Sequence, residues 1–136
     1  IIKILEEFCN SGEVDAELRR EYIEYSSSLV GRRYLKYLRK GHFAIQANLD
    51  LHGLTVECAR DAVDNFIGES IRRGQSCVRI VHGRGIHSPQ KHSQLKGNVQ
   101  RWLCSRRLGR YVIAYTSARR VDGGGGAVYV LLRCVK

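Results

Sequence analysis

The stretch Leu49-Asp50-Leu51-His52-Gly53-Leu54-Thr55 decides how the rest of this chain is interpreted. Successive side chains of a β-strand point to opposite faces, so a strand here places Asp50 and His52 on one face. The leucines of the same strand take the other face. Gly53 and Thr55 stand where the strand would give way to a helix, and Thr55 is a good helix N-cap. The sequence thus predicts an acid and an imidazole side by side at the end of a strand.

Helical and strand patterns alternate after this stretch. Apolar side chains at helical spacing follow Thr55 and end at Arg72-Arg73-Gly74, and a second helical pattern ends near Gly109. Three further β-type runs cover residues 77–81, 111–116 and 127–134. The order β-α-β-α-β-β predicts an α/β fold, namely a two-layer α/β sandwich with a mixed four-stranded sheet. Its first strands pair in parallel across helices, and its last two form a hairpin.

Residues 1–47 are predicted to form an N-terminal helical and basic extension, separate from a domain of residues 48–136. Apolar residues spaced by three or four from Glu13 to Leu29 predict a helix, preceded by a shorter one. The basic segment 31–41 is expected to be a helix or a turn that leads into the first strand. Its interleaved tyrosines and bases suit a solvated surface or contact with single-stranded nucleic acid, and the sequence leaves both open.

The charge of the chain is concentrated after the first 26 residues. The formal net charge is +10, of which residues 1–26 contribute −4, residues 27–48 contribute +5 and residues 49–136 contribute +9. An excess of this kind attracts phosphate backbones. We therefore expect nucleic acid, RNA or DNA, as the partner.

The remaining bulk features predict a cytoplasmic protein. A monomer is favoured, although the acidic N-terminal helix can also mediate self-association or partner docking. The five cysteines are scattered without metal-ligand spacing, which indicates reduced thiols. No uncharged run approaches the roughly 18 residues of a membrane span, and no secretory signal is seen. The chain begins at Ile1 without a Met and can be a fragment.

Two histidines are expected to meet at one edge of the sheet. His52 follows the first strand of the domain and His82 follows the second, and ligands bind beyond the carboxyl ends of strands in open α/β sheets. Neighbouring strands lie ~5 Å apart, so both imidazoles and Asp50 are predicted to share one solvent-reachable cleft. These three side chains suit general acid and base catalysis near neutral pH. The alternative is a buried polar pair that satisfies loop amides.

Two glycine-rich segments are candidates for phosphate binding. In His82-Gly83-Arg84-Gly85 the glycines keep bulk away from the backbone beside an arginine, so amides and guanidinium can approach a phosphate together. Residues 123–126 are four glycines that follow two arginines. The predicted phosphate-binding residues are Gly83, Arg84, Gly85, Arg119, Arg120, Gly124, Gly125 and Gly126. Each segment can also be an ordinary turn. His87 and His92, in a polar loop expected at residues 86–93, fit no metal signature, and no metal site is predicted.

Three motifs in register resemble the Smr (small MutS-related) domain family. Residues 49–55 are similar to its L-D-L-H-G signature, residues 82–85 to H-G-x-G, and residues 123–132 to G-G-x-G-A-x-Y-V-x-L. The resemblance covers about residues 48–134. It extends upstream to Leu38-Arg39-Lys40-Gly41, which resembles a basic element of stand-alone bacterial Smr proteins.

This resemblance implies a fold like the C-terminal domain of a bacterial translation initiation factor. It also implies an endonuclease acting on DNA or RNA, in some members on mRNA at stalled or collided ribosomes. By motif, Asp50 and His52 would be the active pair, with His82 and Arg84 in the second motif. On RNA the histidines would exchange protons with the 2′-hydroxyl and the leaving oxygen, and no cofactor would be required. On DNA, Asp50 would help to hold Mg²⁺ or Mn²⁺. The alternative is a non-catalytic nucleic-acid or ribosome-binding module.

Overall fold

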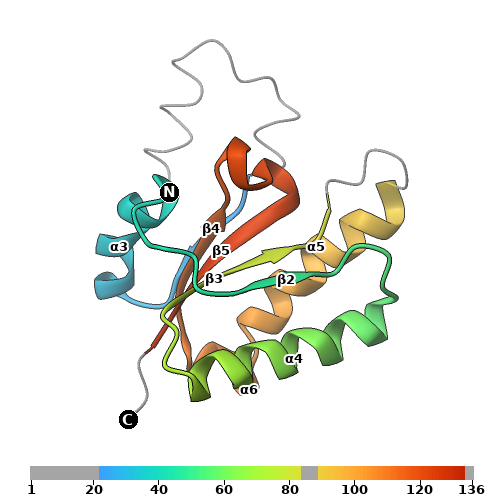
Figure 1. Cartoon of the computed structure of the whole chain (residues 1–136), viewed down its shortest axis with the longest axis horizontal. Helices are drawn as coiled ribbons and strands as arrows, with labels where there is room; N and C mark the ends of the chain where they lie inside the picture. Colours follow the sequence, from blue (N-terminus) through green and yellow to red (C-terminus); the bar gives the residue numbers. More distant parts are fainter. Residues whose placement is uncertain (1–21, 84–88, 134–136) are drawn as a thin grey trace.

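The computed structural model describes residues 22–83 and 89–133 of the chain (Figure 1). Within these residues five strands form one mixed sheet in the order β1-β4-β5-β3-β2. β2 and β3 pair in parallel, whereas β3 with β5, β5 with β4, and β4 with β1 pair antiparallel. The strands are β1 (Glu24–Ser26), β2 (Asn48–Asp50), β3 (Cys77–Val81), β4 (Val112–Ser117) and β5 (Ala127–Leu132). The predicted mixed sheet, its parallel first pair and its final hairpin are confirmed, but β1 adds a fifth strand to the four that were predicted.

Helices lie on both faces of this sheet (Figure 1). The helices are α3 (Leu29–Arg39), α4 (Val56–Arg72), α5 (Pro89–Leu103) and the short α6 (Arg106–Gly109), and two 3₁₀ turns, η1 (Arg120–Asp122) and η2 (Gly124–Gly126), precede β5. Side-chain caps explain where α3 and α4 begin, because Ser28 accepts from the Gly31 N–H and Thr55 from the Cys58 N–H, each at 3.2 Å.

Each face of the sheet carries its own apolar core. On one face, buried residues of α4 and α5 such as Val63 and Val99 pack against Ile80 and Val130 of the central strands. On the other face, α3 buries Leu35 and Leu38 in a smaller cluster, whose other buried members include Tyr129 and Leu131. The sheet and the α4–α5 layer are the two layers predicted for residues 48–136, and α3 adds a layer on the opposite face.

The predicted helix from Glu13 to Leu29 is wrong over residues 24–26, which form β1 at the edge of the sheet. The alternation of side chains in a strand explains the difference, because Ile23 and Tyr25, two residues apart, both pack against the main core. The Tyr25 and Tyr115 rings stack with their centroids 5.3 Å apart. The part of that predicted helix before Tyr22, and the shorter helix, lie outside the described residues. The basic segment forms α3, as one of its two predicted options.

Two smaller boundaries also differ from the prediction. The expected loop at residues 86–93 is shorter, because α5 already begins at Pro89, and proline is favoured at the first position of a helix. The helix expected to run to Gly109 is two helices, since Ser105 caps α6 by accepting from the Leu108 N–H at 3.3 Å. β1 and α3 both pack against β4 of the sheet. The predicted domain boundary between residues 47 and 48 stays a prediction.

Candidate functional site

Three segments that are far apart in the sequence meet at one edge of the sheet. In the parallel register Asp50 lies opposite Val81, and the Leu51 N–H donates to the Val81 carbonyl at 2.8 Å. Beyond β3, the N–H groups of His82 and Gly83 both donate to the Gly126 carbonyl, each at 2.9 Å. The turn after β2, the His82-Gly83 segment and the glycine turn before β5 are therefore joined by backbone contacts. We call this junction the strand-end site.

Asp50 and His52 are both exposed to solvent at this site. The Asp50 carboxylate accepts from the His52 N–H at 2.8 Å, which holds the acid over the turn that carries the imidazole. Gly53 follows with a φ of 81°, a conformation that favours glycine and lets the chain reverse into α4. A carboxylate has further acceptor positions, so Asp50 can still orient an imidazole or bind a cation.

His82 differs from the predicted arrangement, because its side chain is 0% exposed. Side chains alternate along β3, so His82 lies on the same face of the sheet as Ile80, the face that α4 and α5 cover. Asp50 is in register with Val81 and therefore lies on the opposite face. Nδ1 of His82 lies 2.9 Å from the Gly83 carbonyl, which can only accept, so Nδ1 carries the hydrogen. Asp50 and His52 are exposed as expected, whereas the expectation that both imidazoles and Asp50 share one solvent-reachable cleft is wrong for His82. The catalytic roles of all three residues stay predictions.

The glycine segment 123–126 forms compact turns rather than an extended hairpin tip. Gly123 has a φ of 118°, and a Cβ on it would lie 2.8 Å from the Cβ of Ala127, so a larger residue would clash as well as strain the backbone. Gly126 is buried, and its carbonyl is the acceptor that joins this turn to His82 and Gly83. Gly124 and Gly125 are half-buried. Arg84, Gly85 and His87 lie outside the described residues.

A polar network beside the glycine turn was not predicted from the sequence. The Tyr129 hydroxyl donates to the Asp122 carboxylate, and Arg119 and Arg79 make ion pairs with the same carboxylate at 3.3 and 3.6 Å. Arg79 also donates to Asn48 Oδ1 at 2.7 Å. The hydrogen bond from Tyr129, followed by the contacts with Arg119, lowers the pKa of Asp122. This network fastens η1 to two strands.

The sequence did carry a signal for this network. Asn48, Arg79 and Tyr129 occupy one row of the sheet, since Asn48 pairs with Arg79 and Arg79 pairs with Tyr129. In the sequence they are polar interruptions of strand runs, but their common row appears only when the registers of three strands are known.

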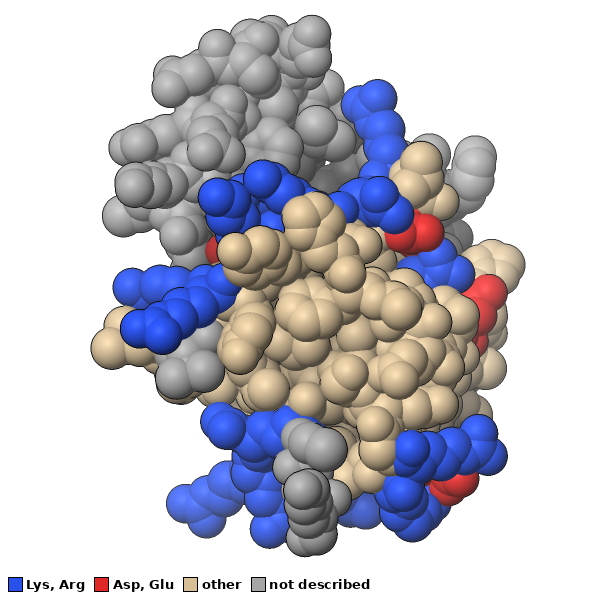
Figure 2. All heavy atoms as spheres, turned by 60° about the vertical axis from the view of Figure 1, so that its left-hand side comes forward, with Lys and Arg blue, Asp and Glu red and all other residues tan. Residues whose placement is uncertain are grey.

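The basic segment is connected to the arginines that precede the glycine turn. α3 exposes Tyr34 and Tyr37, and a Cβ on Gly41, just past its end, would lie 2.5 Å from Nε of Arg119. Arg119 also contacts the Tyr129 hydroxyl, and Arg120 is exposed. Figure 2 shows the α3 side of the molecule, where Lys and Arg gather along the upper and lower borders and few acidic side chains appear.

Within the described ranges, no group of three or more His, Cys, Asp and Glu side chains is arranged to hold a metal ion. The described cysteines, Cys58, Cys77 and Cys104, are free thiols, and burial raises the pKa of Cys77 to about 11. None of the helices in residues 22–83 and 89–133 combines the length and the apolar character needed to cross a membrane.

Comparison with known proteins connects this fold and these motifs to one family. The Smr domain profile matches residues 49–133. The ribosome rescue factor SmrB of Erwinia tasmaniensis is 33% identical over 110 residues, which cover 81% of this chain and 55% of that protein. The probable DNA endonuclease SmrA of Escherichia coli K12 is 32% identical over 129 residues, covering 95% of this chain and 67% of that protein. The chain thus spans about half to two thirds of the length of these relatives.

Solved structures agree with this relationship. YdaL, a stand-alone small MutS-related protein from Escherichia coli, superimposes with a TM-score of 0.71 at 33% identity, covering 82% of this chain and 83% of that one. The Smr domain of Thermus thermophilus MutS2 gives a TM-score of 0.54 at 31% identity, covering 64% of this chain and 98% of that domain.

Proposed function

Because the chain belongs to the Smr domain family, we propose that it is an endonuclease that cleaves phosphodiester bonds of nucleic acid. The observation that carries the proposal is the strand-end site, where three glycine-containing segments are joined beside the exposed Asp50 and His52. The name of one relative, a probable DNA endonuclease, supports nuclease chemistry. The net charge of +10 suits a polyanionic substrate.

RNA is the substrate that we favour, with the ribosome as a partner. Relatives of this chain are named ribosome rescue factors, and an exposed histidine can use the 2′-hydroxyl that RNA alone offers. We expect the protein to act in the cytoplasm as a monomer, without a membrane partner.

On RNA, His52 takes the proton of the 2′-hydroxyl, whose oxygen attacks the adjacent phosphorus while the bond to the 5′ oxygen breaks. Asp50 accepts from the His52 N–H, and its remaining acceptor positions and its charge would hold and stabilise the His52 imidazolium. Arg84 would stabilise the charged phosphorane. In a two-histidine mechanism His82 would protonate the leaving oxygen. Its burial favours a positioning role instead, with protonation of the leaving oxygen by solvent.

On DNA, which lacks the 2′-hydroxyl, the same site needs another nucleophile. Asp50 is the exposed carboxylate at the site, and with a bound Mg²⁺ or Mn²⁺ it would support activation of a water molecule. The two routes are separable, because only RNA cleavage by the 2′-hydroxyl leaves a cyclic phosphate end.

The proposal is tested by incubating the protein with end-labelled single-stranded RNA and DNA, with and without a chelator. We expect RNA cleavage that persists in the chelator and leaves cyclic phosphate ends. Asp50→Asn should abolish cleavage and leave nucleic-acid affinity nearly unchanged, whereas Glu69→Gln, at the far end of α4, serves as the charge-matched control.

A non-catalytic nucleic-acid or ribosome-binding module is the second candidate. The observation that favours it is the connection of α3, with its exposed tyrosines, to Arg119, which provides a binding surface without any chemistry. Purified protein that binds RNA and ribosomes but cleaves neither RNA nor DNA under any of these conditions would establish this alternative and reject the nuclease.

A further inference from the structure

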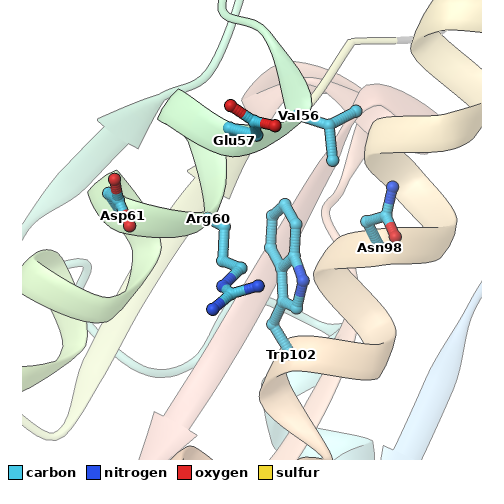
Figure 3. Close-up of a pocket in the computed structure, with 6 residues that line it drawn as sticks. All are labelled: Val56, Glu57, Arg60, Asp61, Asn98 and Trp102. Carbon is cyan, nitrogen blue, oxygen red and sulfur yellow. The ribbon is translucent and has the colours of Figure 1, made fainter.

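A pocket of about 440 Å³ lies between the first half of α4 and the second half of α5 (Figure 3). It is lined by Val56, Glu57, Arg60, Asp61, Asn98 and Trp102. The pocket adjoins the strand-end site along the chain, because Val56 is only four residues after His52. Those four residues span at most about 14 Å.

The lining combines a flat aromatic surface with groups that donate and accept hydrogen bonds. The Arg60 guanidinium lies alongside the Trp102 indole, and Glu57 and Asp61 stand on the same helix turns as Arg60 (Figure 3). Asn98 Oδ1 accepts from Arg101 at 2.8 Å, so the amide nitrogen of Asn98 keeps hydrogens for a further acceptor. The pocket therefore offers stacking, two carboxylate acceptors and an amide donor.

A nucleobase matches this chemistry better than a phosphate or a metal ion does. Unpaired bases stack on aromatic rings and on guanidinium planes and are read along their hydrogen-bonding edges. The two carboxylates repel a phosphate, and the cation of Arg60 between them in the sequence opposes a metal ion. Guanine presents an N–H and an adjacent amino group that one carboxylate can accept together, whereas uracil presents a single N–H between two carbonyl groups.

We propose that this pocket binds one unpaired base of the RNA strand that is cleaved, with a preference for guanine over uracil. This inference rests on the proposed function, and it assigns the pocket to substrate selection near the strand-end site. Trp102 provides the stacking surface, Arg60 closes the pocket beside the indole, and Glu57 or Asp61 accepts from the guanine edge.

The chain offers a direct probe, because Trp102 is its single tryptophan. Tryptophan fluorescence of the Asp50→Asn protein is measured during titration with a short oligouridylate and with the same oligonucleotide carrying one guanosine. The cleavage-deficient variant keeps the oligonucleotides intact. We expect quenching with the guanosine oligonucleotide and at least about five-fold tighter binding than with the oligouridylate, because guanine can donate one more hydrogen bond to a carboxylate than uracil can.

Variants of the lining residues separate base binding from general charge effects. Anisotropy of a labelled guanosine oligonucleotide should show about five-fold or greater weakening for Trp102→Leu and recovery for Trp102→Phe, which keeps an aromatic face. Arg60→Gln should weaken binding more than Arg72→Gln, which removes the same charge from the exposed end of the same helix. Urea unfolding of each variant checks that the fold is kept.

The inference is overturned if neither oligonucleotide quenches Trp102, if the two oligonucleotides bind equally, or if Trp102→Leu binds as tightly as the parent protein. If the wild-type protein still cleaves RNA when one of these results is found, only the base-binding pocket is rejected and the proposed nuclease function is retained. Conversely, guanosine-dependent quenching in a protein that never cleaves RNA supports the pocket and rejects the nuclease.

Discussion

The His52-Gly53 and His82-Gly83 segments have the same residues and follow adjacent parallel strands, yet only one imidazole reaches solvent. Both glycines have positive φ, 81° and 90°. His52 is exposed, and His82 is 0% exposed. The faces of the sheet explain the difference, because strand alternation puts His82 on the face of Ile80, which α4 and α5 cover, whereas Asp50, two residues before His52, is in register with Val81 on the opposite face. The shared dipeptide therefore places a glycine of positive φ after each histidine, and the face of the sheet that each histidine takes decides the burial of its side chain.

This difference suggests separate duties for the two histidines. An exposed imidazole can exchange protons with a bound substrate, whereas a buried one contributes packing and a fixed hydrogen bond. We expect His52 to act in the chemistry and His82 in stability, and variants of each histidine test this division.

The largest expected effect is on cleavage by His52→Ala. Loss of a proton-transfer group should lower the cleavage rate by about 10²- to 10⁴-fold. The free energy of unfolding should stay within about 0.5 kcal/mol of wild type, since the side chain is exposed. Cleavage of labelled RNA and urea unfolding measure the two quantities. A rate within a few-fold of wild type would remove His52 from the chemistry.

His82→Ala should act mainly on stability. Removal of a fully buried ring leaves a cavity and breaks the hydrogen bond with the Gly83 carbonyl, so the free energy of unfolding should fall by about 2 kcal/mol. His82→Asn, which can keep a donor near Nδ1, should lose less.

Cleavage by these proteins distinguishes positioning from proton transfer. If His82→Asn still cleaves with the wild-type dependence on pH, His82 is a positioning residue. If it folds normally but loses cleavage as completely as His52→Ala, the two-histidine mechanism is correct and the division fails.

Asp122→Asn tests the polar network on the other side of β3. Tyr129 and then Arg119 lower the pKa of Asp122 in the folded protein. A lowered pKa stabilises the fold above the unfolded value of about 4, and this stabilisation is lost as pH falls through the folded pKa. Wild type should therefore be more stable than Asp122→Asn at neutral pH, and the gap should narrow below about pH 4. Urea unfolding at several pH values measures the difference in stability between the two proteins. A difference that does not change with pH would contradict the lowered pKa of Asp122.

The smallest expected effect concerns the turn after His52. Thr55→Ala removes the side chain that caps α4 and should cost about 1 kcal/mol of unfolding free energy, whereas Thr55→Ser should cost little. Thermal unfolding measures the stability of each variant. Oligonucleotide binding is measured alongside it, because α4 also carries residues that line the pocket. Equal stability of the two variants would show that α4 does not depend on this cap.

Much of the fold could be predicted because it depends on local patterns. The start of α4 at Thr55, its end before Gly74, the strand at residues 77–81 and the final hairpin all follow from caps, periodicity and turn residues. β1 could not be found in this way, since Tyr22, Tyr25 and Leu29 also fit helical spacing. Pairing of Glu24 with Thr116, 92 residues later, decided the conformation of that segment.

The sequence by itself determined the family, the order of strands and helices after residue 48, and the position of the two His-Gly segments at the ends of neighbouring strands. Those features depend on side-chain periodicity and backbone freedom, which are properties of short segments. Only the tertiary structure decided that His82 is buried while His52 is exposed, that Asp122 contacts Arg79, Arg119 and Tyr129, and that Arg60 and Trp102 line one pocket. Burial and contact between distant segments depend on which strand lies beside which, and no single stretch of sequence contains that information.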